Sequence, residues 1–152
     1  MPASRAGSVS ALAFAALLFP PVLGHAGATA QTARQYDSSG RSVGRTEGQV
    51  TQRHYDASGR FTGRSETRGG TTRHMDSAGR SEGRSEQRGD TLRHYDASGR
   101  ATGRTEWSGD RARLYDASGR STGRIERSGD GWRRYDAQGR LIGRGTGPAP
   151  AR

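Results

Sequence analysis

The sequence predicts an all-β fold, an elongated array of six β-hairpin repeats that form one antiparallel meander sheet. A phrase resembling Tyr-Asp-Ala-Ser-Gly-Arg recurs six times, starting at positions 36, 55, 75, 95, 115 and 135. A nearly constant period of about 20 residues is typical of repeat proteins. Each copy places turn residues between two short stretches that suit strands. The 152 residues include 24 glycines and no cysteine, so disulfides cannot stabilise the array.

Residues 91–110 show how one unit is expected to fold. Residues 91–95 form the first strand, the turn follows from Asp96 to Gly99, and residues 100–106 return as the second strand. An aspartate side chain favours a type I turn, and glycine accepts the left-handed conformation that ends it. The equivalent structural positions across the six units are Tyr36, Asp37, Gly40, Tyr55, Asp56, Gly59, Asp76, Gly79, Tyr95, Asp96, Gly99, Tyr115, Asp116, Gly119, Tyr135, Asp136 and Gly139.

A three-residue turn loop predicts which side chains share a face of the sheet. With Tyr95 opposite Ala101, simple alternation puts Arg93, Tyr95 and Thr105 on one face, and Arg104 on the other. An arginine stands two residues before the tyrosine position in every unit, and we expect its guanidinium to stack on that ring. These six are Arg34, Arg53, Arg73, Arg93, Arg113 and Arg133.

Residues 1–30 have the pattern of a signal peptide. Arg5 gives a positive start, residues 11–18 are apolar, and the small residues at 28–30 suit a cleavage site, which makes Gln31 the mature N-terminus. A membrane anchor is the alternative, but the apolar run is shorter than the roughly 20 residues a spanning helix needs. We therefore expect a secreted or periplasmic protein without a membrane span after cleavage. The repeats then occupy residues 31–144, and residues 145–152 form a disordered tail.

The mature chain has little material for a hydrophobic core. Residues 31–152 hold eight Leu, Ile, Val or Phe side chains. Such a composition is also compatible with an alternative, in which the chain stays unfolded until it binds a partner. The constant placing of Tyr, Asp, Gly and Arg instead favours an ordered array, stabilised unit by unit with fraying ends.

The motif Tyr-Asp-x-x-Gly-Arg resembles the YD repeat of Rhs-type proteins, over residues 34–144. The resemblance implies hairpins joined side by side into a sheet, which in large family members curls into a shell around a toxin. Six units are expected to be too few to enclose anything, and only Leu141 and Phe61 supply the apolar residue after Gly-Arg. A toxin role is not expected.

The longer motif Tyr-Asp-Ala-Ser-Gly-x-x-x-Gly is also similar, in geometry, to the choline- and glucan-binding hairpin repeats of bacterial surface proteins. That family binds ligands in cages of Trp and Tyr between neighbouring units. In this sequence arginine follows the last glycine, where the family has tryptophan, and Trp107 and Trp132 are isolated. A choline site is not expected.

Residues with catalytic or metal-binding chemistry all follow the repeat. His54, His74 and His94 stand one unit apart, or about 9–10 Å across two strands, whereas zinc needs its nitrogen ligands at about 2 Å. The Asp of each unit is explained by its turn, and no second catalytic group recurs beside it. We therefore expect no metal, no cofactor and no enzymatic activity.

The positive charge suggests a binding role. The formal net charge is +10, and the C-terminal repeats are the most basic part of the mature chain. The candidate polyanion-binding residues are Arg111, Arg113, Arg127, Trp132, Arg133, Arg134, Arg140 and Arg144.

Two functions are compatible with these features. The first is a non-enzymatic structural or interaction module at the bacterial cell surface or in the periplasm, which contacts surface proteins or its own copies through unpaired edge strands. The alternative is a module that binds a polyanion or glycan, such as a cell-wall polymer, lipopolysaccharide or extracellular DNA. Intracellular nucleic acid fits poorly with export. Only the second function predicts binding that weakens steeply with salt.

Overall fold

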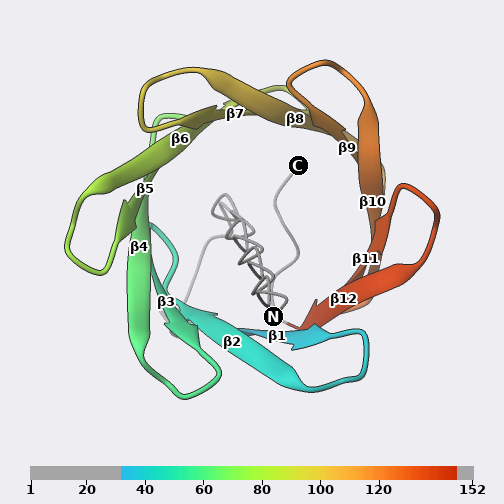
Figure 1. Cartoon of the computed structure of the whole chain (residues 1–152), viewed down its shortest axis with the longest axis horizontal. Coiled ribbons are helices and arrows are strands. Elements are labelled where there is room, and N and C mark those ends of the chain that lie inside the picture. The colour runs from blue at the N-terminus through green and yellow to red at the C-terminus, as the bar shows by residue number, and fades with distance from the viewer. Residues whose placement is uncertain (1–31, 147–152) are drawn as a thin grey trace, which may run out of the picture.

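The computed structural model describes residues 32–146, which form twelve antiparallel β-strands (Figure 1). The predicted signal peptide and residues 147–152 lie outside the described residues, and the last strand includes residues 145 and 146, which were assigned to the tail. The strands are β1 (Thr32–Asp37), β2 (Ser42–Glu47), β3 (Thr51–Asp56), β4 (Phe61–Arg68), β5 (Thr71–Asp76), β6 (Ser81–Arg88), β7 (Thr91–Asp96), β8 (Ala101–Ser108), β9 (Arg111–Asp116), β10 (Ser121–Ser128), β11 (Gly131–Asp136) and β12 (Leu141–Thr146).

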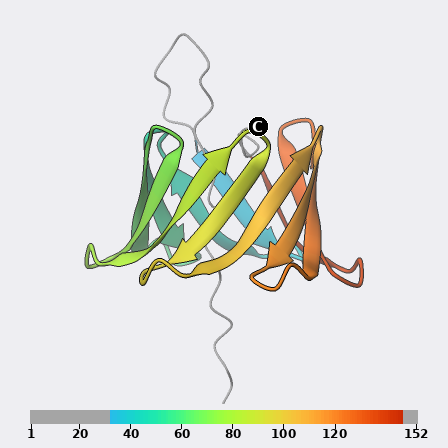
Figure 2. The same ribbon diagram turned by 90° about the horizontal axis from the view of Figure 1, so that it is seen from above.

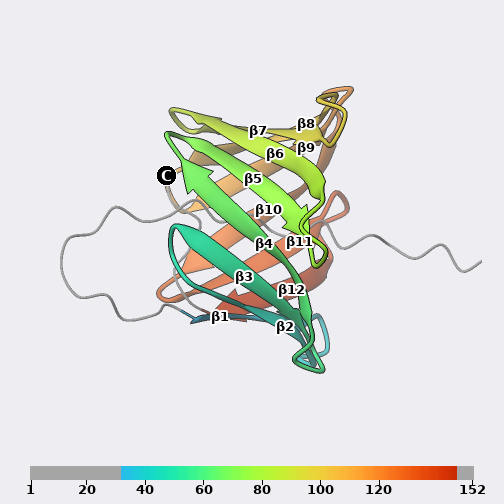
Figure 3. The same ribbon diagram turned by 90° about the vertical axis from the view of Figure 1, so that its left-hand side faces the viewer.

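The sheet closes into a barrel, because β1 pairs with β12 as well as with β2. At this seam Arg34 lies opposite Thr146, and Tyr36 lies opposite Arg144. The predicted open, elongated array is therefore wrong, although the all-β class and the six hairpins are as expected. The strands slant across the barrel wall, as closure requires (Figures 2 and 3).

Closure follows from the twist and bend that the hairpins share. Strands twist in a fixed sense, and a β-bulge increases the local twist and bends the strand. All six hairpins carry a register shift at the equivalent place, for example between His94 and Tyr95 in β7–β8. Six units that curve alike bring the first strand back to the last. The repeat period alone does not reveal this curvature.

The two strands of each hairpin are joined by the turn that the sequence predicts. In the fourth unit the Asp96 amide donates to the carbonyl of Arg100 at 2.9 Å, and the Gly99 amide donates to the carbonyl of Asp96 at 3.0 Å. The Asp96 carboxylate accepts hydrogen bonds from the backbone N–H of Ser98 and of Arg100. Gly99 has a φ of +84°, which is why glycine occupies this position. The same backbone pattern recurs in all six units, so the turn prediction is confirmed.

The faces of the second strand of each hairpin were predicted wrongly. Tyr95 lies opposite Ala101, as expected, but His94 lies opposite Gly103, which leaves Thr102 as the extra residue of a bulge. One extra residue exchanges the two faces for the rest of the strand. Arg93 therefore lies opposite Arg104 on one face, and Thr105 belongs to the other face.

The two faces of the barrel differ sharply in burial. The buried non-glycine residues all alternate onto one face, and the positions between them carry the arginines and tyrosines. Side chains converge on the concave side of a closed sheet, so the buried set identifies the interior face. The buried residues are Ala33, Thr46, Gln52, Ser65, Thr72, His74, Ser85, Leu92, Thr105, Trp107, Ala112, Ile125 and Trp132.

The interior face divides into an apolar and a polar part. Trp107, Ala112, Ile125 and Trp132 form the apolar cluster of β8–β11, with Leu114 packed against it. On β2–β6 the residues that alternate onto the interior face are polar or glycine. Because the apolar cluster is small, the closed ladder of backbone hydrogen bonds contributes a larger share of the stability of this fold than it would in a barrel with an entirely apolar interior.

Candidate functional site

Twelve arginines, one from each strand, form a band on the exterior face of the barrel, the arginine belt. They face one another in six cross-strand pairs of identical register within the hairpins. The pairs are Arg34–Arg45, Arg53–Arg64, Arg73–Arg84, Arg93–Arg104, Arg113–Arg124 and Arg133–Arg144.

The arginines of the even-numbered strands are held by two neighbours. Arg45 lies 4.2 Å from the centre of the Tyr55 ring on the next strand, and its Nε donates to Glu47 at 2.8 Å. Arg84, Arg104 and Arg124 repeat both contacts, and Arg64 repeats the ion pair. The hydrogen bond from Arg124 lowers the pKa of the Glu126 carboxyl, so that this carboxylate stays charged at neutral pH.

These contacts correct the predicted stacking. In the structure the guanidinium on the rings of Tyr55, Tyr95, Tyr115 and Tyr135 comes from the arginine after the last glycine of the preceding unit, as Arg84 on Tyr95 shows. The sequence-based prediction assigned this contact to the arginine two residues before the tyrosine, such as Arg93. That residue does share the face of Tyr95, but the register places Arg84 directly opposite the ring.

The arginines of the odd-numbered strands are left open to binding. Each is exposed, and none forms an ion pair with another residue of the range 32–146. They lie two strands apart, which corresponds to about 9–10 Å. The six are Arg34, Arg53, Arg73, Arg93, Arg113 and Arg133.

The belt is most basic at the seam between β12 and β1. In the other units a glutamate stands two residues after the even-strand arginine, whereas Thr146 takes that place after Arg144. Arg34 lies opposite Thr146 and Arg144 opposite Tyr36, so the two arginines are diagonal neighbours at the seam with no carboxylate at this position of the belt. Arg133 lies opposite Arg144 on the other side, which extends the basic sector to β11.

The structure divides the polyanion-binding residues predicted from the sequence. The register places four of them, Arg111, Arg113, Arg133 and Arg144, on the exterior face. Arg140 lies in an Asp-led turn, where its Nε donates to the Asp136 carboxylate at 2.7 Å.

The other three predicted residues, Arg127, Trp132 and Arg134, alternate onto the interior face, so they cannot act together with the belt. Arg127 lies 4.0 Å from the centre of the Trp107 ring. Sequence reasoning also missed the belt arginines of β1–β8, because it looked for local charge excess. The signal that could have found them is the constant offset of arginine in each unit.

A shallow groove adjoins the belt near the turn of the fifth unit. Its volume is about 310 Å³, and Arg93, Tyr95 and Arg104 form one part of its lining, with Asp116 and Ala117 at the turn. It places the guanidinium groups of Arg93 and Arg104 beside the Tyr95 ring, which suits an anionic ligand, while the Asp116 carboxylate already accepts hydrogen bonds from Ser118 and Arg120 in its turn.

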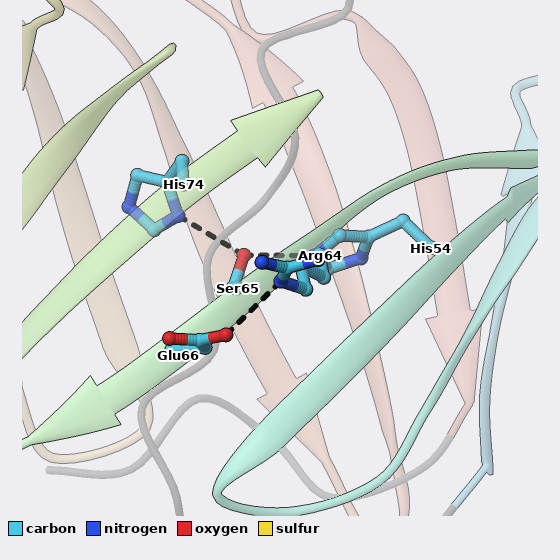
Figure 4. A network of polar contacts seen from close by, with 5 residues as sticks. All are labelled: His54, Arg64, Ser65, Glu66 and His74. Atoms are coloured by element: carbon cyan, nitrogen blue, oxygen red, sulfur yellow. Dashed lines mark hydrogen bonds and ion pairs between the residues drawn. The ribbon is translucent and has the colours of Figure 1, made fainter. Parts of the chain in front are cut away.

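The histidines singled out in the sequence belong to a hydrogen-bonded chain on the interior face. The Nδ1 of His54 lies 3.0 Å from the Thr46 hydroxyl. On the other side of the ring, Nε2 lies 2.8 Å from the Ser65 hydroxyl (Figure 4). Ser65 lies in turn 3.0 Å from Nδ1 of His74. The figure also shows Arg64 and Glu66, the ion pair of the exterior face on the same strand.

The chain continues in the same way across β6–β8. His74 Nε2 lies 3.2 Å from the Ser85 hydroxyl, which is 2.9 Å from Nδ1 of His94. His94 Nε2 lies 3.0 Å from the hydroxyl of Thr105. A neutral imidazole donates at one nitrogen and accepts at the other, and a hydroxyl does both. The chain is therefore fully satisfied when all three histidines are neutral.

Burial keeps these histidines neutral. It lowers the pKa of His54 and of His94 below the ordinary value. The pKa of His74 falls to about 4, first because of burial and then because of the charges that His54 and His94 would carry. Hydroxyls occupy both nitrogens of every ring, and residues 32–146 contain no group of three or more His, Asp or Glu side chains that could hold a metal ion.

A search of the described residues for membrane-spanning helices and a comparison of the chain with protein families and curated proteins both found no match. Within residues 32–146 no helix is long and apolar enough to cross a membrane. The chain matches no protein-family model and no curated protein, so its similarity to YD repeats stays a prediction from the motif.

Proposed function

We propose that this protein is an exported, non-enzymatic binding module whose arginine belt holds an acidic polymer, namely an acidic glycan of the cell wall or cell surface. The observation that carries the proposal is the row of six exposed arginines that lack an ion pair within the described residues. Each faces a second arginine, and like charges directly opposite each other destabilise a sheet. An external polyanion would remove this repulsion.

The spacing of the belt supports a linear ligand. Neighbouring strands lie about 4.8 Å apart, so a polymer that crosses the strands meets an arginine at every step. Guanidinium groups bind carboxylates and phosphates through two parallel hydrogen bonds. The groove beside Tyr95 offers an aromatic surface next to two of these arginines.

The first function predicted from the sequence, an interaction module that associates through sheet edges, loses the structural basis of that association. Pairing of β1 with β12 leaves no unpaired edge among the strands of residues 32–146. Within residues 32–146, contacts with other surface proteins or with further copies would use the same exterior face or the turns at the rims.

The proposal is tested by binding to a linear polyuronate at increasing salt, with neutral dextran and double-stranded DNA as comparison polymers. We expect saturable binding to the polyuronate that weakens linearly in log Kd against log salt concentration. The double variant R73Q/R93Q should bind more weakly and show a smaller slope, by about 0.7–0.9 per lost contact if the polymer behaves like a nucleic acid.

The matched control is R80Q/R140Q, which removes two arginines that are already paired with Asp76 and Asp136 in turns. It changes the net charge equally but leaves the belt intact, so its affinity should stay close to that of the unaltered protein. Equal losses in both double variants, or binding insensitive to salt, would contradict a role for the belt. Preference for DNA over the polyuronate would reject a glycan as the ligand.

A further inference from the structure

Arg134 is a cation placed among the interior side chains of the barrel. On β11 it occupies the position that His54, His74 and His94 occupy on β3, β5 and β7. Its cross-strand neighbours are Ile125 on β10 and Gly143 on β12. The guanidinium is thus next to the apolar cluster rather than in the arginine belt.

No residue of the range 32–146 balances the charge of Arg134. Among these residues its Nε is buried without a hydrogen-bond partner, and its side chain forms no ion pair. All 15 acidic residues of the sequence lie between Asp37 and Asp136, so every acidic side chain is among the described residues. Burial lowers the pKa of Arg134, which reflects the cost of holding this charge without a counter-ion.

The nearest acidic residues on the same face are already used in turns. Asp136 stands two residues after Arg134, but its carboxylate accepts hydrogen bonds from Arg140. Asp37 lies opposite Gly143 across the seam, and its carboxylate accepts from Ser39. Neither supplies the missing partner.

The strand beside Arg134 places no side chain on the interior face next to it. β12 turns only Gly143 and Gly145 toward the interior along this stretch, and the ring of Trp132 covers Gly145. Across the seam on β1, Asp37 lies opposite Gly143 and Gln35 lies opposite Gly145, so Gln35 is the interior side chain there that does not belong to a turn. Arg134 and Gln35 are therefore two strands apart and offset by two residues along the strands, so their Cα atoms are more than about 10 Å apart, and the strand between them turns only glycine toward the interior.

We propose that Arg134 binds a small oxyanion, a phosphate, sulfate or carboxylate group, on the interior face of the barrel beside Gly143, with the Gln35 amide as a second donor. The planar guanidinium offers several donors in a fixed arrangement that matches such a group. This site is separate from the arginine belt and does not depend on the polymer-binding proposal.

The two tryptophans of the sequence make the site observable in the full chain. Trp107 and Trp132 both belong to the apolar cluster, and Trp132 lies two residues before Arg134 on the same face. Titration with sodium phosphate and with sodium sulfate, at constant ionic strength kept by chloride, should change the tryptophan emission in a saturable way. Bound phosphate should also raise Tm in proportion to its occupancy.

The R134H variant places at this position the residue that three other units have there. It should weaken phosphate binding at least tenfold, and R134Q should do the same. Q35A, which keeps the Arg134 cation, should weaken phosphate binding a few-fold. It tests the site if the Arg134 variants do not fold. The control R73Q, in the arginine belt, should keep the phosphate response.

A response that is not saturable, or that persists in R134H and R134Q, would overturn the interior site. The two proposals fail independently of each other. R134H should retain polyuronate binding, and R73Q/R93Q should lose that binding while retaining the phosphate response.

Discussion

Ser85 is held by His94, whose Nδ1 lies 2.9 Å from the serine hydroxyl, at a position where the serine is only 1 % exposed. On its other side the same hydroxyl meets His74 at 3.2 Å. A hydroxyl between two imidazoles satisfies one nitrogen of each, so the serine matters more for stability than its size suggests.

Replacing Ser85 with alanine should destabilise the barrel by about 2–3 kcal/mol, because it leaves one buried nitrogen on His74 and one on His94 without a partner. Chemical unfolding measures the change. The control is Ser81→Ala on the same strand, where the serine is exposed and the change should stay within about 0.5 kcal/mol. Equal effects of the two substitutions would show that the chain of hydroxyls does not stabilise the fold.

Acid should weaken the barrel in the range where histidine titrates. The pKa values of His54, His74 and His94 are lower in the folded state than the ordinary 6.5, so the unfolded chain binds more protons below that pH. Stability should therefore be full above about pH 6.5 and fall as the pH drops toward 4, with His74 contributing at most about 3 kcal/mol. Unfolding free energies measured at pH 7.5, 6, 5 and 4.5 check this.

The turn aspartates affect the stability of the barrel in a separate, lower pH range. Hydrogen bonds within each turn lower their pKa below 3.8, as for Asp96, so their contribution is present above that value and is lost only at lower pH. The triple variant H54Q/H74Q/H94Q should lose the decline between pH 6.5 and 4.5 and keep the decline at lower pH. A constant stability of the unaltered protein from pH 7.5 to 4.5 would contradict the neutral state of the histidines.

The bulge should not tolerate a side chain on its glycine. A Cβ on Gly103 would collide with the backbone carbonyl oxygen of Tyr115 on the next strand. Gly103→Ala should therefore cost about 1–3 kcal/mol, since backbone has to move. Thr102→Ala, at the exposed extra residue of the same bulge, should change the unfolding free energy by less than about 0.5 kcal/mol. If Gly103→Ala proves as mild as Thr102→Ala, the close approach of β8 and β9 is wrong.

The seam can be given the ion pair that it lacks. Thr146→Glu places a carboxylate two residues after Arg144, as Glu126 stands after Arg124. It should stabilise the barrel by up to about 1 kcal/mol and weaken polyuronate binding, because it neutralises the most basic sector of the belt. Thr122→Glu adds the same charge at an exposed bulge position and should give no stabilisation. Thermal unfolding and the polymer titration compare the two variants.

The local chemistry of the sequence predicted the turns but not the closure. Asp96 and Gly99 determine their turn by their own side-chain and backbone preferences, so four residues suffice to recognise it. Closure instead depends on the summed curvature of twelve strands, and no single residue near Arg34 or Thr146 indicates it. The bulge at Thr102 has an equally weak signature, since a threonine there suits a regular strand as well.

For the same reason, only part of the candidate site could be predicted from the sequence. The charge of the C-terminal repeats predicted an anion-binding surface, whereas the repeated arginines were assigned to stacking on tyrosine, and without the bulge the alternation assigned Arg104 to the wrong face. Arg134 and Arg133 are neighbours in sequence, so charge counting could not tell that one faces the interior and the other the arginine belt. The hydroxyls of Ser65 and Ser85 became meaningful only once the register placed them between histidines.

The pairing of β1 with β12 makes every repeat an internal one, so no unit of the barrel should fray as an end unit would. Each hairpin pairs with a neighbour on both sides, so the hairpin that comes first in the sequence has the same strand pairing as the others. A circularly permuted protein, in which residues 32 and 146 are joined through a short linker and the chain is opened at one of the Asp-led turns, should therefore rebuild the same ring.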